Sequence, residues 1–160
     1  MNRSASRPVT LVTETIDPTG IAALEKFSTV ARPTQADKPS ILREVEPANA
    51  IIVRVAPITA DVISAASNLQ IIQKHGVGVD SIDVQYATGL GIPVCITAEA
   101  NAASVSEFAV ASTMALIKKL REHEQIVRGG GWRDAGVEGV HEIAGHTVGV
   151  VGGGRVGLRV

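Results

Sequence analysis

The feature that most constrains the fold is a glycine-rich stretch that follows a short apolar run. Residues 147–151 read Thr-Val-Gly-Val-Val, a β-branched run typical of a buried parallel strand. The run continues directly into Gly152-x-Gly154-x-x-Gly157. In this spacing Gly152 permits a tight turn, Gly154 admits phosphates close to the backbone, and Gly157 lets a helix pack near the strand. The stretch predicts the first strand-turn of a dinucleotide-binding Rossmann domain, with the pyrophosphate at the helix N-terminus.

Two further interpretations bear on this stretch. The first is a glycine-rich turn that binds no ligand, and this interpretation remains possible. The second is a P-loop, which is excluded because no Gly-Lys-Ser/Thr follows the glycines. The acidic residue that holds the ribose is expected roughly 20 positions after the glycines. That position would fall beyond Val160, so we expect the Rossmann domain to be truncated here.

Composition narrows the class of protein. Hydrophobic residues make up 45% of the chain and aromatic residues 2%, so its apolar mass is mainly aliphatic, as in buried parallel strands and the helices that cover them. A balance of 15 basic against 16 acidic residues predicts neither a nucleic-acid partner nor an anionic membrane. No apolar run reaches the roughly 18 residues of a membrane span. Cys95 is the single cysteine, which excludes an internal disulfide and suits the cytoplasm.

Strand and helix patterns alternate between residues 8 and 97. We expect strands at residues 8–16, 28–31, 50–55, 69–74 and 93–97. We expect helices at residues 21–27 after an Asp17-Pro18 start, 36–45, 60–66 with Thr59 as the cap, and 82–87 with Gly89 or Gly91 ending the helix. Such alternation predicts a parallel sheet with helices on both faces. The prediction for residues 8–100 is a flavodoxin-like α/β domain.

Residues 101–128 have a different pattern. Ser104 and Glu107 have the spacing of a capping box, and the positions up to residue 117 are mostly apolar or small. From residue 118 the pattern turns charged, and Gly129-Gly130-Gly131 can end the helix. We expect one connector helix that is buried in its first half and exposed in its second. Residues 129–160 would then cross into the incomplete dinucleotide-binding Rossmann domain.

Candidate binding residues follow two of the predicted strands. Arg54 ends a buried strand, where a guanidinium suits a ligand carboxylate or pairs with a nearby acid. The backbone of Gly76-Val77-Gly78 either presents N–H groups to an anion or makes a simple turn, and both alternatives stay open. His75 has no acidic partner at a suitable spacing, so we interpret it as structural. Cys95 lies in an apolar strand and is interpreted as inert. We expect no metal site.

Five motifs carry a family resemblance. They are Ile51–Arg54, His75–Asp83, Gly91–Val94, Asn101–Glu107 and Ile143–Gly157. In this order and spacing the chain resembles the D-isomer-specific 2-hydroxyacid dehydrogenases, the family of D-3-phosphoglycerate dehydrogenase. The likeness runs from about residue 50 to the end, and residues 1–49 fit only in pattern. In this family a substrate domain and an inserted dinucleotide domain share one chain.

The resemblance implies particular residues on the substrate side. Arg54 and the backbone of Val77 and Gly78 would lie at the substrate carboxylate, with Asn101 near both substrate and nicotinamide. Val55 departs from the small or hydroxylated residue that often follows the arginine. The partner implied is a small 2-hydroxy or 2-keto acid.

The resemblance also implies a cofactor site. Val105 would border the nicotinamide, and the glycine stretch would hold the pyrophosphate through Gly152, Gly154, Arg155, Val156 and Gly157. The cofactor implied is NAD, with NADP not excluded, and the family member would be a homodimer.

The family's catalytic arginine, glutamate and histidine would all lie beyond residue 160. We therefore expect no catalytic residue in this chain and no activity from it alone. The leading hypothesis is the N-terminal part of an NAD(P)-dependent oxidoreductase that moves hydride between cofactor and 2-hydroxy acid. The alternative is a non-catalytic α/β module that binds a small anion, or a regulatory subunit that pairs with a longer relative.

Overall fold

The structure is a computed structural model that describes residues 7–132 and 136–160. The chain divides into two compact units, one ending at Ala98 and the other running from Glu99 to Val160. We call them the sheet unit and the helical unit. Each is described by itself.

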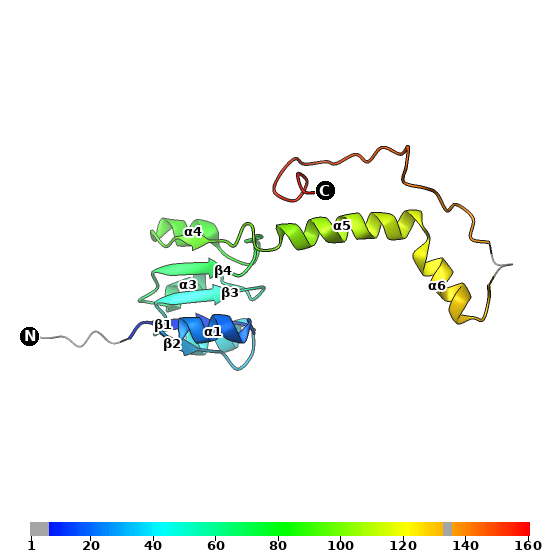
Figure 1. The fold of residues 1–160 in the computed structure, drawn as a ribbon. Coiled ribbons are helices and arrows are strands. Elements are labelled where there is room, and N and C mark those ends of the chain that lie inside the picture. The colour runs from blue at the N-terminus through cyan, green and yellow to red at the C-terminus, as the bar shows by residue number, and fades with distance from the viewer. Residues whose placement is uncertain (1–6, 133–135) are drawn as a thin grey trace, which may run out of the picture. The chain divides into compact units, whose positions relative to one another are not determined.

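The sheet unit is built on five parallel strands (Figure 1). The strands are β1 (Val9–Val12), β2 (Thr29–Ala31), β3 (Ala50–Val53), β4 (Ile71–Lys74) and β5 (Val94–Cys95). Their spatial order is β2-β1-β3-β4-β5. This order confirms the predicted flavodoxin-like parallel sheet. Every strand is shorter than its apolar run, because the ends of the runs belong to the loops at the edges of the sheet.

Four short helices connect these strands. They are α1 (Pro18–Leu24), α2 (Lys38–Glu44), α3 (Ala60–Ala65) and α4 (Val84–Gly89). In the view of Figure 1, α1 lies in front of the sheet and α3 behind it, as the alternating pattern predicts.

The predicted helix ends are confirmed in part. At the start of α1 the Asp17 carboxylate accepts the backbone N–H of Thr19 at 2.8 Å. Thr59 stands at the N-cap of α3, but its hydroxyl donates to the side chain of Asp61 and makes no cap bond, so the expected capping bond is wrong. Gly91 takes the left-handed conformation after α4, with φ +73°, whereas Gly89 lies within the helix.

The core of the sheet unit lies where the central strands meet the helices. Leu11, Ile51 and Ile72 are completely buried on β1, β3 and β4. Ile41 of α2 and Ile63 of α3 belong to the same cluster. Each such side chain contributes roughly 1.5–3 kcal/mol through burial. This aliphatic core fixes the strand register and therefore the positions of the loops at the sheet edges.

The helical unit contains α5 (Ala102–Ile117) and α6 (Leu120–Arg128) in place of the single predicted helix. The break lies at Lys119, which adopts the left-handed conformation with φ 50°. A right-handed helix cannot continue through such a residue, so the prediction of one continuous helix is wrong. Gly129 caps α6, and Gly130 with φ +81° follows, as predicted.

The start and burial of α5 also differ from prediction. The N-cap is Asn101, so Ser104 lies inside the helix and the predicted capping box with Glu107 does not form. Phe108 is 73% exposed and Leu116 is 74% exposed. The expected buried first half is therefore wrong for this chain. Within α5 only Ala102 and Ser106 are buried.

Residues 147–151 form no strand, in contrast to the prediction. A strand needs a hydrogen-bonded neighbour, and the helical unit supplies none among its described residues. Val151 is accordingly exposed. Across the described ranges, none of the helices combines the length and the hydropathy needed to cross a bilayer.

Candidate functional site

The candidate site lies at the carboxyl edge of the sheet. Strands of a parallel sheet all end at the same edge, and ligands of open α/β folds bind there. Glu14 follows β1, and residues 54–56, which we call the Arg54 loop, follow β3. Residues 75–78 follow β4 and Thr97 follows β5. The structure thus brings Arg54, Val77 and Gly78 to one edge of the sheet unit.

Glu14 holds the Arg54 loop from the β1 side. Its carboxylate accepts the backbone N–H groups of Arg54 at 2.8 Å, Val55 at 2.5 Å and Ala56 at 2.6 Å. Partial burial raises the pKa of Glu14, but the hydrogen bonds from Thr13 and from these backbone groups outweigh it. The pKa is therefore held below its ordinary value. Consequently the loop is fixed through its backbone by an ionised carboxylate.

Lys74 holds the same loop from the β4 side. Its side chain is buried, with the residue only 8% exposed, and its ammonium group donates to the backbone carbonyl of Arg54. The Arg54 side chain is exposed and forms no ion pair with any acid in the part of the chain that the structure describes. The guanidinium is therefore available to a ligand while its backbone is fixed on both sides.

The glycine-containing loop after β4 is tied to β5. Gly76 adopts φ +144°, and its N–H donates to the Thr97 hydroxyl at 2.9 Å. The Thr97 N–H returns a bond to the Gly76 carbonyl at 2.9 Å. Beyond this tie, Val77 and Gly78 are exposed. Their backbone is consequently exposed at the surface, next to Gly76, which is hydrogen-bonded to Thr97. His75 is also exposed.

Asn101 and Val105 lie in the helical unit, at the start of α5. The Asn101 carbonyl accepts the N–H of Val105 at 2.9 Å, the first bond of the helix. Both residues are exposed.

The glycine loop, residues 152–157, forms a tight turn in the helical unit. Gly152 adopts φ +107°, and a Cβ atom at Gly157 would lie only 1.9 Å from the Gly152 carbonyl oxygen. No side chain larger than hydrogen fits there. The N–H of Leu158 bonds to the carbonyl of Gly154 at 3.0 Å, as in the first turn of a helix. Gly154 has open space around its Cα.

Arg155 lies on the exposed side of this loop. Its guanidinium Nε is 3.2 Å from a carboxylate oxygen of Glu99, in an exposed ion pair. The backbone N–H groups of Arg155 and Val156 make no hydrogen bond to another described residue. The loop therefore combines free N–H groups with a helix start, which is the arrangement that binds anions.

Sequence reasoning missed Glu14, Lys74 and Thr97. Lys74 and Thr97 each end a predicted strand at the carboxyl edge, a position that could have singled them out. Glu14 lies inside the predicted strand of residues 8–16, which the structure ends earlier, at Val12. The residue type alone did not indicate a role in the site, because a glutamate or lysine beside a strand is usually solvated. Their partners are backbone groups of a neighbouring loop, which no sequence motif records.

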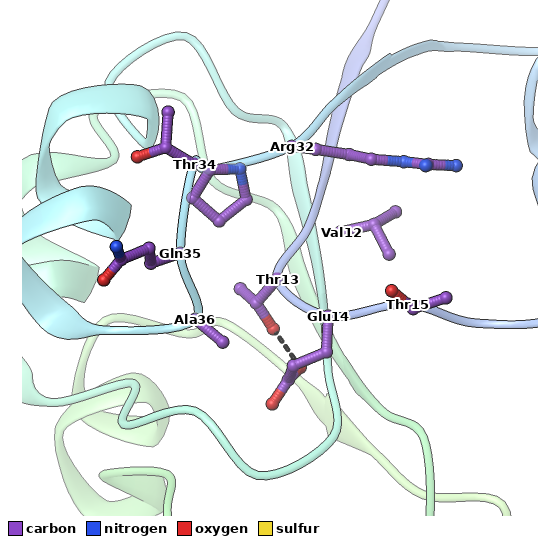
Figure 2. A pocket seen from close by; sticks show the side chains of 9 residues that line it. Val12, Thr13, Glu14, Thr15, Arg32, Thr34, Gln35 and Ala36 are labelled. Carbon is purple, nitrogen blue, oxygen red and sulfur yellow. Dashed lines mark hydrogen bonds between the residues drawn. The ribbon is translucent and has the colours of Figure 1, made fainter.

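Glu14 also lines a pocket between the ends of β1 and β2 (Figure 2). The pocket has a volume of about 290 Å³. In the view of Figure 2, the Arg32 side chain extends to the upper right, Thr34 and Gln35 lie at the left, and Glu14 lies at the lower centre with Thr15 to its right. Among the described residues, no group of three or more His, Cys, Asp or Glu side chains gathers in a way that could hold a metal ion.

Comparison with known proteins gives a consistent picture. The family model described as D-isomer specific 2-hydroxyacid dehydrogenase, catalytic domain, matches residues 10–149. The D-3-phosphoglycerate dehydrogenase of Archaeoglobus fulgidus is 40% identical over 128 residues, which is 79% of this chain and 24% of that protein.

Solved structures show the same likeness. The NADPH-dependent glyoxylate/hydroxypyruvate reductase of Sinorhizobium meliloti, solved with NADP and malonate, matches with a TM-score of 0.82 at 29% identity, over 96% of this chain and 49% of its own. The D-lactate dehydrogenase of Aquifex aeolicus, complexed with NAD and lactic acid, matches with a TM-score of 0.81 at 28% identity, over 94% and 46%. The chain thus spans about half of these structures and a quarter of the A. fulgidus relative.

Proposed function

Because the chain belongs to the D-isomer-specific 2-hydroxyacid dehydrogenase family, we propose that it forms one side of the substrate site and the start of the cofactor site of an oxidoreductase. The reaction is hydride transfer between a nicotinamide cofactor and a small 2-hydroxy or 2-keto acid. The observation that carries the proposal is the exposed Arg54 guanidinium on a loop whose backbone is held by Glu14 and Lys74.

On the substrate side, Arg54 pairs with the carboxylate of the 2-keto acid. A guanidinium forms bidentate hydrogen bonds with a carboxylate and stays charged at every relevant pH. The exposed backbone of Val77 and Gly78 supplies N–H groups to the same carboxylate. Asn101 contributes an amide that hydrogen-bonds the substrate. These groups bind and orient the substrate and do not themselves move hydride or proton.

On the cofactor side, the glycine loop holds the pyrophosphate of NAD or NADP. Gly152 and Gly157 close the turn, Gly154 leaves space for a phosphate, and the N–H groups of Arg155 and Val156 would donate hydrogen bonds to it. Val105 would border the nicotinamide. When bound, the nicotinamide supplies or accepts the hydride. The relatives solved with NADP and with NAD support a nicotinamide cofactor without deciding between the two.

None of these roles is that of a general acid or base. Such a group contributes typically 10²–10⁴-fold to rate, so we assign turnover to the whole enzyme and propose that the 160-residue chain is inactive by itself. We further propose that the enzyme is cytoplasmic and a homodimer. The exposed apolar side chains of Phe108 and Leu116 on α5 support the dimer.

The test is carboxylate binding by the 160-residue chain. Pyruvate and oxalate are titrated into the ¹⁵N-labelled chain, and amide shifts are followed at Val77 and Gly78. We expect saturable binding that weakens roughly tenfold or more in Arg54→Gln, the loss of one good charge-assisted pair. Arg121→Gln, on the exposed surface of α6, is the matched control. Binding that is indifferent to Arg54→Gln would contradict the assignment.

The absence of turnover has its own test. We expect no protein-dependent NADH oxidation with any of a panel of 2-keto acids, monitored at the absorbance of NADH. A saturable rate that scales with the concentration of the chain would overturn the proposal of inactivity.

A second candidate function is a non-catalytic module that binds small anions. The favouring observation is that every hydrogen bond of the Arg54 loop and of the Gly76–Thr97 tie has its partner inside the sheet unit. Such a module would bind inorganic phosphate as well as it binds pyruvate, and NADH would not change either affinity. A dehydrogenase would prefer the 2-keto acid and bind it more tightly with NADH present.

A further inference from the structure

The Glu14 carboxylate is surrounded by donors of one loop. Its Oε1 accepts the N–H groups of Val55 and Ala56, and its Oε2 accepts the N–H of Arg54. The Thr13 hydroxyl bonds to Oε2 as well. Three successive backbone N–H groups therefore converge on one side chain that is forty residues or more away in sequence.

We propose that Glu14 is a positioning residue for substrate binding: its carboxylate sets the backbone of residues 54–56 so that the Arg54 guanidinium meets the substrate carboxylate. The part played by Arg54 rests on the proposed function. The hold of Glu14 on the loop stands on the hydrogen bonds alone.

Only a carboxylate of this length satisfies the loop. Both oxygens are acceptors, and each faces a donor of the loop. A glutamine in the same place offers one acceptor oxygen, and its NH₂ group would face an N–H donor. Bonds to an ionised acceptor are roughly twice as strong as neutral ones. Glu14→Gln therefore removes both an acceptor and the charge while keeping the shape of the side chain.

Lys74 makes the hold two-sided. Its ammonium group donates to the Arg54 carbonyl, while Glu14 accepts the Arg54 N–H. Both polar backbone groups of Arg54 are thus held by charged side chains, one from Glu14 after β1 and one from Lys74 at the end of β4. Because the Arg54 side chain itself is exposed and unpaired with any described acid, these backbone bonds are what fix the point from which the guanidinium extends.

Loss of the hold should appear as a loss of affinity. A loop that samples several conformations binds its ligand with an apparent affinity reduced by the fraction of the binding-competent conformer. If Glu14→Gln leaves roughly a tenth of the loops competent, the apparent Kd for the substrate carboxylate rises about tenfold. The ionisation of Glu14 supports this reading, since its hydrogen bonds keep the pKa below the ordinary value.

The experiment uses the 160-residue chain in three forms: native, Glu14→Gln and Glu44→Gln. Glu44 is an exposed carboxylate at the end of α2, so Glu44→Gln makes the same chemical change away from the loop. Amide hydrogen exchange is measured at Arg54, Val55 and Ala56 without ligand. Oxalate and pyruvate affinities are then measured for the same samples by amide shift titration.

We expect exchange at these amides to rise roughly tenfold or more in Glu14→Gln alone, the effect of losing a charge-assisted bond, together with weaker oxalate binding. Unchanged exchange in Glu14→Gln would overturn the proposal, as would faster exchange with unchanged affinity. A third outcome is that exchange is slow only when Glu14 is present, but the chain binds no 2-keto acid. That outcome would contradict the proposed function and would still show that Glu14 holds the Arg54 loop. If Glu14→Gln unfolds the sheet unit, Glu14→Asp, which keeps the charge and shortens the reach, replaces it with the same expected outcomes.

Discussion

The Arg54 loop of the sheet unit and the glycine loop of the helical unit differ in what surrounds them. The Arg54 loop donates backbone hydrogen bonds to Glu14 and accepts one from Lys74. Glu14 follows β1 and Lys74 ends β4, and both strands lie in one sheet with a buried core. The glycine loop follows residues 147–151, which are exposed and have no neighbouring strand among the described residues. Nevertheless, a turn of the expected kind forms there.

The two loops differ in what determines their structure: local backbone chemistry in the glycine loop and distant partners in the Arg54 loop. The turn at Gly152–Gly157 follows from local backbone chemistry, because positive φ at Gly152 and a missing Cβ at Gly157 close it without outside help. The Arg54 loop depends on partners that the sheet alone brings together. Damage to the sheet should therefore disturb the Arg54 loop and spare the glycine loop, and damage to the glycine loop should do the reverse.

The largest effect is expected from the core of the sheet. Ile51 lies on β3, completely buried beside the central strands. Ile51→Ala should lower the free energy of unfolding of the sheet unit by about 2–5 kcal/mol, through lost burial and the cavity left behind. Urea unfolding, followed by circular dichroism and by amide signals of both units, measures it.

The matched control is Ile96→Ala, because Ile96 is 44% exposed just after β5. We expect the control to cost much less and the signals of residues 152–158 to be unaffected by either variant. A loss of the glycine-loop signals together with the sheet would show that the two loops depend on one another.

A smaller effect is expected from Lys74. Lys74→Met keeps the length of the side chain but leaves the Arg54 carbonyl without its donor. An acceptor deprived of its partner costs about 1–3 kcal/mol, which should appear in the urea unfolding of the sheet unit and in faster exchange at the Arg54 loop. Lys26→Met, on the surface after α1, should cost little. Equal costs for the two variants would show that the ammonium group of Lys74 does not hold the loop.

Acid should release the Arg54 loop next. The pKa of Glu14 is lower in the folded chain than its ordinary value of 4.5. Its contribution to stability is therefore present above pH 4.5 and is lost as the pH falls through the folded pKa. Exchange at Val55 and Ala56, corrected for the intrinsic rate, should rise in that window in the native chain and be independent of pH there in Glu14→Gln. A native chain without this rise would contradict an ionised Glu14.

A weaker acid effect concerns the ion pair between α2 and α3. Lys38 Nζ lies 2.6 Å from an Asp61 carboxylate oxygen, and hydrogen bonds from Lys38 and then Thr59 lower the pKa of Asp61 to about 2. Both side chains are substantially exposed, so the pair should contribute little and lose most of that in high salt. Asp61→Asn should change the unfolding midpoint only slightly, and the Asp61 carboxyl should titrate well below its ordinary pKa of 3.8. A midpoint shift as large as that of Lys74→Met would be contrary to this view.

The fold was predictable from the sequence wherever the residues of an element by themselves determine its structure. The alternating apolar runs predicted the five parallel strands, since each buried strand carries its signal in its own residues. The break at Lys119 and the exposure of Phe108 were not predictable in this way. Helix periodicity continues through Lys119, and the burial of an apolar helix face depends on what packs against it.

The residues of the candidate site also fall into those that the sequence predicted and those that it did not. Arg54, Val77 and Gly78 were singled out because they end strands at the ligand-binding edge, and the structure places all of them there. Glu14 and Lys74 were missed because their roles are bonds to the backbone of a loop on another strand. Such bonds become visible only once the strand order is known.

The smallest effect on global stability is expected from the glycine loop, although the local change is severe. A Cβ atom at residue 157 would lie 1.9 Å from the Gly152 carbonyl oxygen, so Gly157→Ala must open the turn. The helical bond between Leu158 and Gly154 should be lost, as judged from amide shifts of residues 152–158. Unfolding of the sheet unit should not change measurably, because the core formed by its described residues contains none of residues 152–158.

Gly153→Ala provides the matched control for this variant. A Cβ atom at residue 153 meets nothing within 4 Å, and its backbone lies outside the left-handed region, so the same chemical change should leave the turn closed. If both variants open the turn, the backbone flexibility lost with glycine matters more than the contact at Gly152. If only Gly157→Ala opens it, the turn is set by one close approach of backbone to backbone. The glycine loop would then be organised locally, as the comparison with the Arg54 loop requires.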